Sequence, residues 1–231
     1  MEYSDVIPAE FVRRINRFVA VVLVNGVPET VHVKNTGRCL ELLVPGCTVY
    51  LSKSSNASRK TKYDLITVEK KRGNKPPLLV NIDSLAPNYA VGEWLLKSGL
   101  FSDNSVIRRE VFYGKSRFDF FIDDNGSKTY LEVKGVTLEN NSIAAFPDAP
   151  TERGVKHVNE LAECVGNGHR GIIVFVIQME DVNIFRPNDE THPEFGEALR
   201  KANRAGVEIL AVNCLVTADS MTIDSVIPVE L

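Results

Sequence analysis

The stretch RFDFFIDDNGSKTYLEVKG, residues 117–135, carries the strongest signals for local structure and chemistry in this chain. Asn125-Gly126 predicts a two-residue β-hairpin turn, because a type I′ turn needs a positive φ at both central positions. With that turn, the numbers of directly opposed residues add up to 251, so that Asp119 faces Glu132. Opposed residues share a face with Cβ atoms roughly 4.5–5.5 Å apart, and Lys134, two residues beyond Glu132, lies on the same face.

Two carboxylates at this separation repel each other unless a proton or a cation lies between them. Oxygen ligands suit Mg²⁺ or Mn²⁺, and a cation held by two carboxylates beside a lysine is suited to phosphodiester hydrolysis. We therefore expect Asp119 and Glu132 to bind the metal, with the Val133 backbone carbonyl as a third oxygen. Lys134 would orient the attacking water or stabilise charge on the phosphate oxygens.

A simpler interpretation is a surface hairpin in which Glu132 and Lys134 form an ordinary ion pair. Two features argue against it: residues 130–136 are otherwise apolar on both faces, and Asp119 lies within an apolar run. A charge within buried strands is costly unless it is paired or bound to a metal. Registers with sums of 249 or 253 would keep the three side chains on one face, whereas a one-residue bulge would separate them.

The composition is that of an ordinary globular protein, with 231 residues, 44% of them hydrophobic and 25% charged. One large or two small domains fit this length. The sequence contains no apolar run near the roughly 20 residues of a membrane span, and its start does not resemble a signal peptide. The four cysteines form no CxxC pair, which argues against a zinc site and predicts reduced thiols in a cytoplasm.

Charge is distributed unevenly along the chain. Residues 1–80 contain 13 Lys and Arg against 7 Asp and Glu, whereas residues 81–231 contain 14 against 23. A basic N-terminal part beside an acidic C-terminal part indicates contact with a polyanion by the first and metal-binding carboxylates in the second.

Residues 1–80 predict an all-β domain, with strands at about 16–24, 29–34, 47–52, 63–71 and 77–80. Five short strands are typical of an OB-like barrel, which binds nucleic acid through a basic groove and aromatic side chains that stack on bases. The basic side chains expected to contact nucleic acid are Arg13, Arg14, Arg17, Arg38, Lys60 and Lys62. The aromatic side chains are Phe18, Tyr50 and Tyr63, although a solvated basic loop and three core aromatics would give the same pattern.

Residues 81–231 change to an α/β pattern. Helices are expected at about 87–100, 151–165 and 193–205, a buried and parallel strand at 171–178, and a last strand at 207–212. Together with the hairpin, this order predicts a mixed sheet with helices on both sides, and a chain that is α+β overall.

Four further residues could serve the site, each with a simpler alternative. Glu93 either pairs with Lys97 at i+4 on the helix surface or points toward the carboxylate hairpin. Arg153 and Lys156 either contact the phosphate backbone or form a solvated helix face. Gln178, at the end of the buried strand, either supports the metal-binding residues or caps the strand, and we expect His157 to be structural or on the surface.

Several motifs resemble the sugar fermentation stimulation protein family: NTG at 35–37, LVPG at 43–46, FPDA at 146–149, TERGVKH at 151–157, GHR at 168–170 and AGVE at 205–208. The resemblance covers the whole chain, and the TERGxKH block is its most specific part. It implies an OB-like N-terminal domain, a C-terminal domain similar to PD-(D/E)xK nucleases, DNA binding and a regulatory link to sugar use.

The resemblance also assigns roles to individual residues. Asp119 matches the PD aspartate, Glu132 and Lys134 match the (D/E)xK pair, and Glu93 matches the helix glutamate of that fold. The chain departs from the family pattern where Lys34 replaces the usual proline, in a slightly longer segment at 80–88, and where Pro150 precedes Thr151.

Two functions therefore compete. One is a Mg²⁺-dependent endonuclease acting on phosphodiester bonds; the other is a DNA-binding regulator of sugar catabolism genes that does not cut. A sugar-binding function rests on the family name, and Trp94 is interpreted as a core residue. DNA is the expected partner, without a membrane; the sequence leaves the form of the DNA and the oligomeric state open, a homodimer included.

Overall fold

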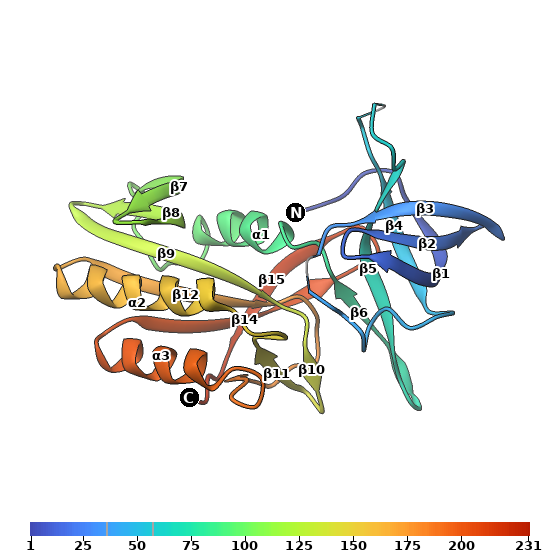
Figure 1. The fold of residues 1–231 in the computed structure, drawn as a ribbon. Helices are drawn as coiled ribbons and strands as arrows, with labels where there is room; N and C mark the ends of the chain where they lie inside the picture. The colour runs from blue at the N-terminus through green and yellow to red at the C-terminus, as the bar shows by residue number, and fades with distance from the viewer. Residues whose placement is uncertain (36, 57) are drawn as a thin grey trace.

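The N-terminal strands form a closed barrel in the computed structural model, which describes residues 1–35, 37–56 and 58–231. These strands are β1 (Val6–Asn16), β2 (Val19–Val24), β3 (Val27–Val33), β4 (Thr48–Lys53), β5 (Tyr63–Arg72) and β6 (Lys75–Asn81). They pair in the order β3-β2-β1-β4-β5-β6, and a parallel contact between β3 and β5 closes a ring of five strands (Figure 1). The predicted OB-like barrel is confirmed.

The strand predicted at about 16–24 corresponds to β2, which begins only at Val19. Reasoning from sequence did not predict β1, which precedes it and is separated from it by a turn at Arg17 and Phe18. Arg13 and Arg14 lie within β1. The Asn25-Gly26 turn between β2 and β3 is confirmed, with φ values of 51° and 79°.

The C-terminal part is built on a second six-stranded sheet. Its strands are β7 (Val106–Tyr113), β8 (Ser116–Asp124), β9 (Ser127–Val136), β12 (Arg170–Ile177), β14 (Glu208–Val216) and β15 (Met221–Ile227). They pair in the order β15-β14-β12-β9-β8-β7, with β9, β12 and β14 parallel to one another. A small sheet of β10 (Glu139–Asn140), β11 (Ile143–Phe146) and β13 (Ile184–Pro187) lies beside it. The predicted mixed sheet and the parallel buried strand are confirmed.

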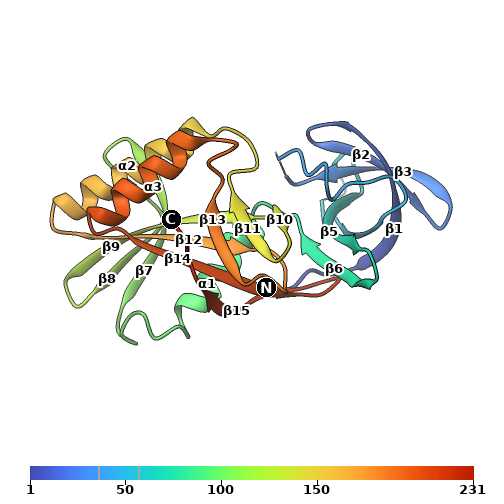
Figure 2. The ribbon, with the colours of Figure 1, turned by 90° about the horizontal axis from the view of Figure 1, so that it is seen from below.

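Helices cover both faces of this sheet. They are α1 (Ala86–Leu95), α2 (Glu152–Gly166) and α3 (Pro193–Arg204). Figure 2 shows α2 and α3 on one side of the sheet and α1 on the other, and the buried side chains form two corresponding clusters. The helix predicted at 87–100 ends earlier, at Leu95, because Leu96 and Lys97 are exposed and Gly99 adopts a positive φ.

The hairpin that joins β8 to β9 has the predicted turn. Asn125 and Gly126 have φ values of 54° and 89°, and Asp124 pairs with Ser127 across them. Opposed residues add up to 251 from there to the pair of Phe120 and Leu131, so the predicted register is confirmed over this ladder.

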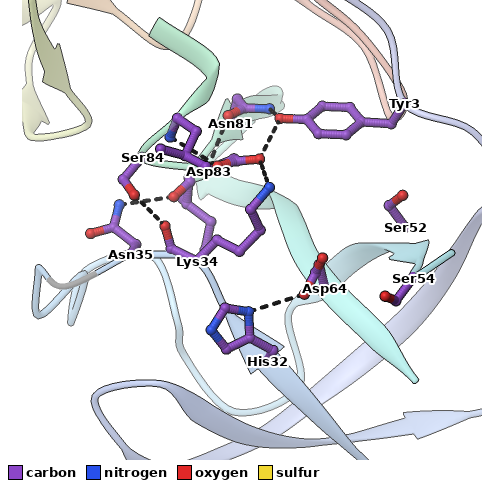
Figure 3. A network of polar contacts seen from close by, with 12 residues as sticks. Tyr3, His32, Lys34, Asn35, Ser52, Ser54, Asp64, Asn81, Asp83 and Ser84 are labelled. Carbon is purple, nitrogen blue, oxygen red and sulfur yellow. Dashed lines mark hydrogen bonds and ion pairs between the residues drawn. The ribbon is translucent and has the colours of Figure 1, made fainter. Parts of the chain in front are cut away.

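A buried polar network joins the barrel to the start of α1 (Figure 3). Asp83 is 2% exposed, and its Oδ2 accepts hydrogen bonds from Lys34 Nζ at 2.5 Å and from the Tyr3 hydroxyl at 3.3 Å. Its Oδ1 accepts one from the Leu85 N–H at 2.9 Å, directly before the helix. Lys34, the first residue after β3, therefore connects the barrel to the segment that begins α1.

Gln178 completes this junction from the end of β12. Its Nε2 donates to the Asn81 carbonyl at 2.9 Å and to the Asp83 carbonyl at 3.2 Å. A Cβ on Gly135 would lie 2.5 Å from the Gln178 Oε1 and 2.9 Å from the Pro87 Cγ. The absence of a side chain at Gly135 therefore lets the start of α1 pack against strand β9.

All four cysteines are buried and free. Among residues 1–35, 37–56 and 58–231, no helix is long and apolar enough to span a bilayer.

We predict that replacing Lys34 by Met destabilises the protein, because Asp83 would remain buried without its cation. Removing one partner of a buried ion pair costs about 3–5 kcal/mol, and we expect about 2 kcal/mol here because Lys34 is partly exposed. The urea midpoint, followed by circular dichroism, measures the change. Lys53→Met, at an exposed lysine of β4, is the control; equal midpoints for the two variants would contradict the prediction.

Candidate metal and catalytic centre in the C-terminal sheet

Asp119 lies where strand β8 separates from β9. The ladder between the two strands runs from Asp124 to Phe120, and Asp119 follows directly. There its Oδ2 accepts a hydrogen bond from the Val133 N–H at 2.8 Å, in place of a backbone carbonyl of the neighbouring strand. The side chain thus enters the gap between the strands and is held close to Glu132 by the backbone of β9.

Glu132 and Lys134 project from β9 toward helix α2. The Glu132 Oε1 accepts hydrogen bonds from Lys134 Nζ at 2.5 Å and from His157 Nδ1 at 2.6 Å. Glu132 is 3% exposed, and His157 is buried as well. Because Arg153 Nε donates to His157 Nε2 at 3.4 Å, Nε2 acts as the acceptor and Nδ1 carries the proton donated to Glu132.

The second oxygen of Glu132 makes this arrangement unusual. The Oε2 atom is buried and finds no hydrogen-bond partner in residues 1–35, 37–56 and 58–231, although such an oxygen normally has one. The Val133 carbonyl points to the same side of β9 as its N–H, which is the side of Asp119, because both groups of a strand residue face one neighbour. Two carboxylates and a carbonyl are the donor set of a hard divalent cation, so these residues fit Mg²⁺ or Mn²⁺.

Side chains alone do not complete such a site. In the described parts of the chain, no cluster of three or more His, Cys, Asp or Glu side chains could hold a metal. A cation at this place would depend on Asp119, Glu132, the Val133 carbonyl and water.

The two carboxylates are shifted in opposite directions. Burial, and then the nearby charge of Glu132, raises the pKa of Asp119 against the hydrogen bonds from Val133 and Asn88. Burial also acts to raise the pKa of Glu132, but the hydrogen bond from His157 and the charge of Lys134 outweigh it, and the pKa is lowered. A pair separated in this way is typical of sites where two acids have different tasks.

The expected orientation of Glu93 toward the hairpin is wrong. Its side chain is 57% exposed, and its Oε2 lies 2.8 Å from the amino group of Met1 rather than near Lys97 or the carboxylates. Glu93 lies near the end of α1, whereas the beginning of the helix faces the site. There Asn88 Nδ2 donates to the Asp119 Oδ1 at 2.8 Å, so an amide occupies the place expected for a helix carboxylate.

Arg14 does not belong with the basic residues expected to contact nucleic acid. Its guanidinium donates to four backbone carbonyls, those of Arg17, Asn35, Gly37 and Arg38, at 2.5–2.8 Å. It therefore holds the loop that contains the NTG motif, of which Thr36 lies outside the described residues.

The other basic residues expected on the barrel remain available. Their side chains are exposed: Arg13, Arg17, Arg38, Lys60 and Lys62. Ala57, in the basic loop before Lys60, lies outside the described residues. Phe18 is half exposed, whereas the Tyr50 hydroxyl donates to Glu69 at 2.7 Å.

The remaining candidates have structural contacts. Arg153 orients His157, as described above. Lys156 is exposed, and its Nζ lies 3.7 Å from the Glu160 Oε1. Gln178 donates hydrogen bonds to the interdomain segment and not to the carboxylates, so of its two expected roles the structural one at the strand end is observed.

His157 and Asn88 are the residues that reasoning from sequence missed. His157 is expected from sequence to be structural or on the surface; it is structural, on the buried face with Gly154, Val158 and Leu161, but its contact with Glu132 was not expected. The signal was available, because positions 154, 157, 158 and 161 have helical spacing on one face. Asn88 carried no comparable signal, since its role depends on how the start of α1 meets Asp119.

The fold and the site together define a protein with an OB-like barrel joined to a mixed α/β domain that carries a buried carboxylate pair. Comparison with known families agrees: residues 12–77 match the "SfsA N-terminal OB domain" and residues 85–220 the "Sugar fermentation stimulation protein RE domain". The chain belongs to the sugar fermentation stimulation protein family, as its motifs predicted.

Relatives match over the full length of the chain. The sugar fermentation stimulation protein homologs of Clostridium beijerinckii and Ruminiclostridium cellulolyticum are each 49% identical to it, over 100% of both chains. A solved structure, that of Pyrococcus furiosus SfsA in complex with Ca²⁺, is 30% identical with a TM-score of 0.86, covering 100% of this chain and 98% of the other.

We predict opposite stability changes for the two carboxylates in the metal-free protein at pH 7. Asp119→Asn should stabilise the fold by about 0.5–2 kcal/mol, because it removes a buried charge repelled by Glu132. Glu132→Gln should destabilise it by about 2 kcal/mol, because Lys134 and His157 lose their anionic partner. Urea denaturation with a chelator present measures both.

The pH dependence follows the same signs. The pKa of Asp119 is raised above its ordinary 3.8. The folded state therefore binds this proton more tightly than the unfolded state, and protonation of Asp119 stabilises the fold as pH falls. The pKa of Glu132 is lowered below its ordinary 4.5, so its contribution is present above pH 4.5 and is lost as pH falls further. Destabilisation by both substitutions would contradict the assignment.

Proposed function

We propose that this protein binds DNA and hydrolyses phosphodiester bonds at the Asp119–Glu132–Lys134 centre with Mg²⁺ or Mn²⁺. The observation that carries the proposal is Glu132, whose one oxygen is fixed by Lys134 and His157 while the other is buried without a partner. A purely structural glutamate would have little reason to leave an oxygen desolvated and unpaired.

Asp119, Glu132 and the Val133 carbonyl would hold the metal. When bound, such an ion supplies an activated water and offsets charge on a phosphoryl oxygen. The Pyrococcus furiosus relative was solved in complex with Ca²⁺, a cation that also takes oxygen ligands. This supports a divalent cation for the present chain.

The surrounding side chains would keep the centre in position. His157 fixes the rotamer of Glu132, and Asn88 fixes that of Asp119. The Lys134 side chain is about one-seventh exposed, at 15%, so its ammonium can reach a phosphate oxygen while it remains near Glu132. It would then stabilise the charge that develops on that oxygen.

DNA would be bound mainly by the barrel. The exposed Arg and Lys side chains of the N-terminal domain lie on an OB-like fold, which commonly binds strands through a positive groove. The four cysteines are free and buried, as is typical of proteins in the reducing cytoplasm, so we expect the protein to meet DNA there.

One observation favours the second function, a DNA-binding regulator of sugar catabolism genes that does not cut. The α1 side chain that contacts Asp119 is the amide of Asn88 and not the expected carboxylate of Glu93, which lies beside the Met1 amino group. A centre with two acidic side chains would bind a cation more weakly. The relatives' names connect the family with sugar fermentation, and a regulator would account for that connection.

We predict that Lys134→Ala separates cleavage from binding. The substitution removes the ammonium but neither carboxylate, so cleavage should fall about 10²–10³-fold, as on loss of a contact made in the transition state. Calorimetry with Mn²⁺ and DNA binding should change little. Gel assays with single-stranded, duplex and branched DNA in Mg²⁺ or Mn²⁺ measure the cleavage.

Two further variants control this experiment. Lys128→Ala, at an exposed lysine on the same strand β9, should cut like the unaltered protein. The double variant Asp119→Asn, Glu132→Gln should show no heat of Mn²⁺ binding. If the unaltered protein binds DNA with Mn²⁺ and cuts none of these forms, the regulator is the correct function.

We predict that the barrel sets the salt dependence of DNA binding. Each phosphate contact contributes roughly 0.9 to the slope of log K against log salt concentration for a duplex. Arg13→Ala combined with Arg17→Ala should remove about two phosphate contacts and therefore reduce the slope by roughly 1.8. Lys201→Ala with Arg204→Ala, two exposed positions on α3, should leave the slope unchanged; the reverse result would place DNA on the C-terminal domain.

A further inference from the structure

A hollow of about 320 Å³ opens beside Asp119, between the start of α1 and strands β7 and β8. Leu85 and Tyr89 of the α1 region border it, and they are 51% and 50% exposed. Two large apolar side chains are thus partly exposed next to a centre that is otherwise charged. Binding pockets begin at about 300 Å³, so this hollow suits one small, flat group.

Arg109 of β7 also borders the hollow, on the same side as Tyr89, and is held in place by its neighbours. Its guanidinium lies 5.3 Å from the centre of the Tyr89 ring and 5.2 Å from that of Phe120. A Cβ on Gly92 would lie 2.5 Å from Arg109 Nη2, so the missing side chain at Gly92 lets the guanidinium lie against α1. The ring and the cation therefore present a fixed surface that can stack with another π-system.

Hydrogen bonds connect this wall to the carboxylate centre. Arg109 Nη2 donates to the Asn88 carbonyl at 2.7 Å, and the Asn88 side chain donates to Asp119. Asp119 itself borders the hollow. A group in the hollow would therefore lie next to whatever Asp119 and Glu132 bind.

We infer that this hollow binds one unstacked nucleobase of a single DNA strand, stacked on Tyr89 and Arg109, next to the phosphate at the carboxylate centre. The inference rests on the proposed function and specifies its substrate. In a duplex each base face is covered by its neighbours, so a base can enter such a hollow only from a single strand, a frayed end or a flipped-out position. The chain would accordingly prefer single-stranded or frayed DNA to continuous duplex.

The experiment compares Tyr89→Ala with Tyr89→Phe by fluorescence anisotropy, using a labelled single-stranded oligonucleotide and the matching blunt duplex in Ca²⁺. Base stacking on an aromatic ring contributes enough that its loss should weaken single-strand binding roughly tenfold. Tyr89→Phe keeps the ring and should bind like the unaltered protein, and duplex binding should change in neither variant. Phe112→Ala removes an aromatic ring that is 69% exposed on the same strand as Arg109 but outside the hollow, and it should have no effect.

A second readout reports on the base itself. A set of oligonucleotides carries 2-aminopurine at successive positions. On binding to the unaltered protein, the fluorescence should change for one position of the probe, and this change should be absent with Tyr89→Ala. If DNA binds but Tyr89→Ala and Phe112→Ala bind alike, the hollow is not a base site and the proposed function stands. If neither form of DNA binds, both proposals are overturned.

Discussion

Glu132 brings a negative charge into the interior of the C-terminal sheet, and its surroundings keep it there. A buried carboxylate needs partners that satisfy it, since desolvation favours its neutral form. Lys134 from the same strand and His157 from α2 provide these partners at one oxygen. The position of α2 is thereby fixed: its buried face must place an imidazole over β9, and Arg153 in turn holds the imidazole. The other oxygen lies beside Asp119 and would be free to bind the metal proposed above.

The barrel is connected to this centre through the start of α1. Asp83 receives Lys34 from the barrel and caps the turn at Leu85, and three residues further Asn88 holds Asp119. Gln178 binds the same segment from the sheet, and Gly135 lets it approach. Only short, hydrogen-bonded steps separate the two domains, so a change in the barrel can shift α1, and with it Asn88 and Tyr89. This hydrogen-bonded junction would allow the two domains to act on one ligand, as the proposed function requires.

The features that sequence predicted are those fixed by local rules. Asn-Gly determines the turn and therefore the register of the hairpin, and unbroken apolar residues mark β12 as a buried strand. The predictions that failed depend on tertiary placement. Arg14 is basic like its neighbours, but in β1 it faces the carbonyls of a distant loop. Glu93 has the expected residue type on the expected helix, but α1 presents its first turn to Asp119. His157 shows that a polar residue on an apolar stripe is better interpreted as a buried partner than as a surface group.

The opposite charges of the two parts of the chain suggest how binding and chemistry would divide. Residues 81–231 carry 23 acidic against 14 basic residues, so most of that surface repels a phosphate backbone. A strand attracted by the barrel would meet favourable charge again near Lys134 and Arg109, which both lie close to Asp119. Affinity would then come from the barrel, and the choice of DNA form from the small region around the hollow. On this division a weak cation site would be no disadvantage, because a strand held by the barrel would bring its own phosphate oxygens to the metal, which two carboxylates alone would leave incompletely coordinated.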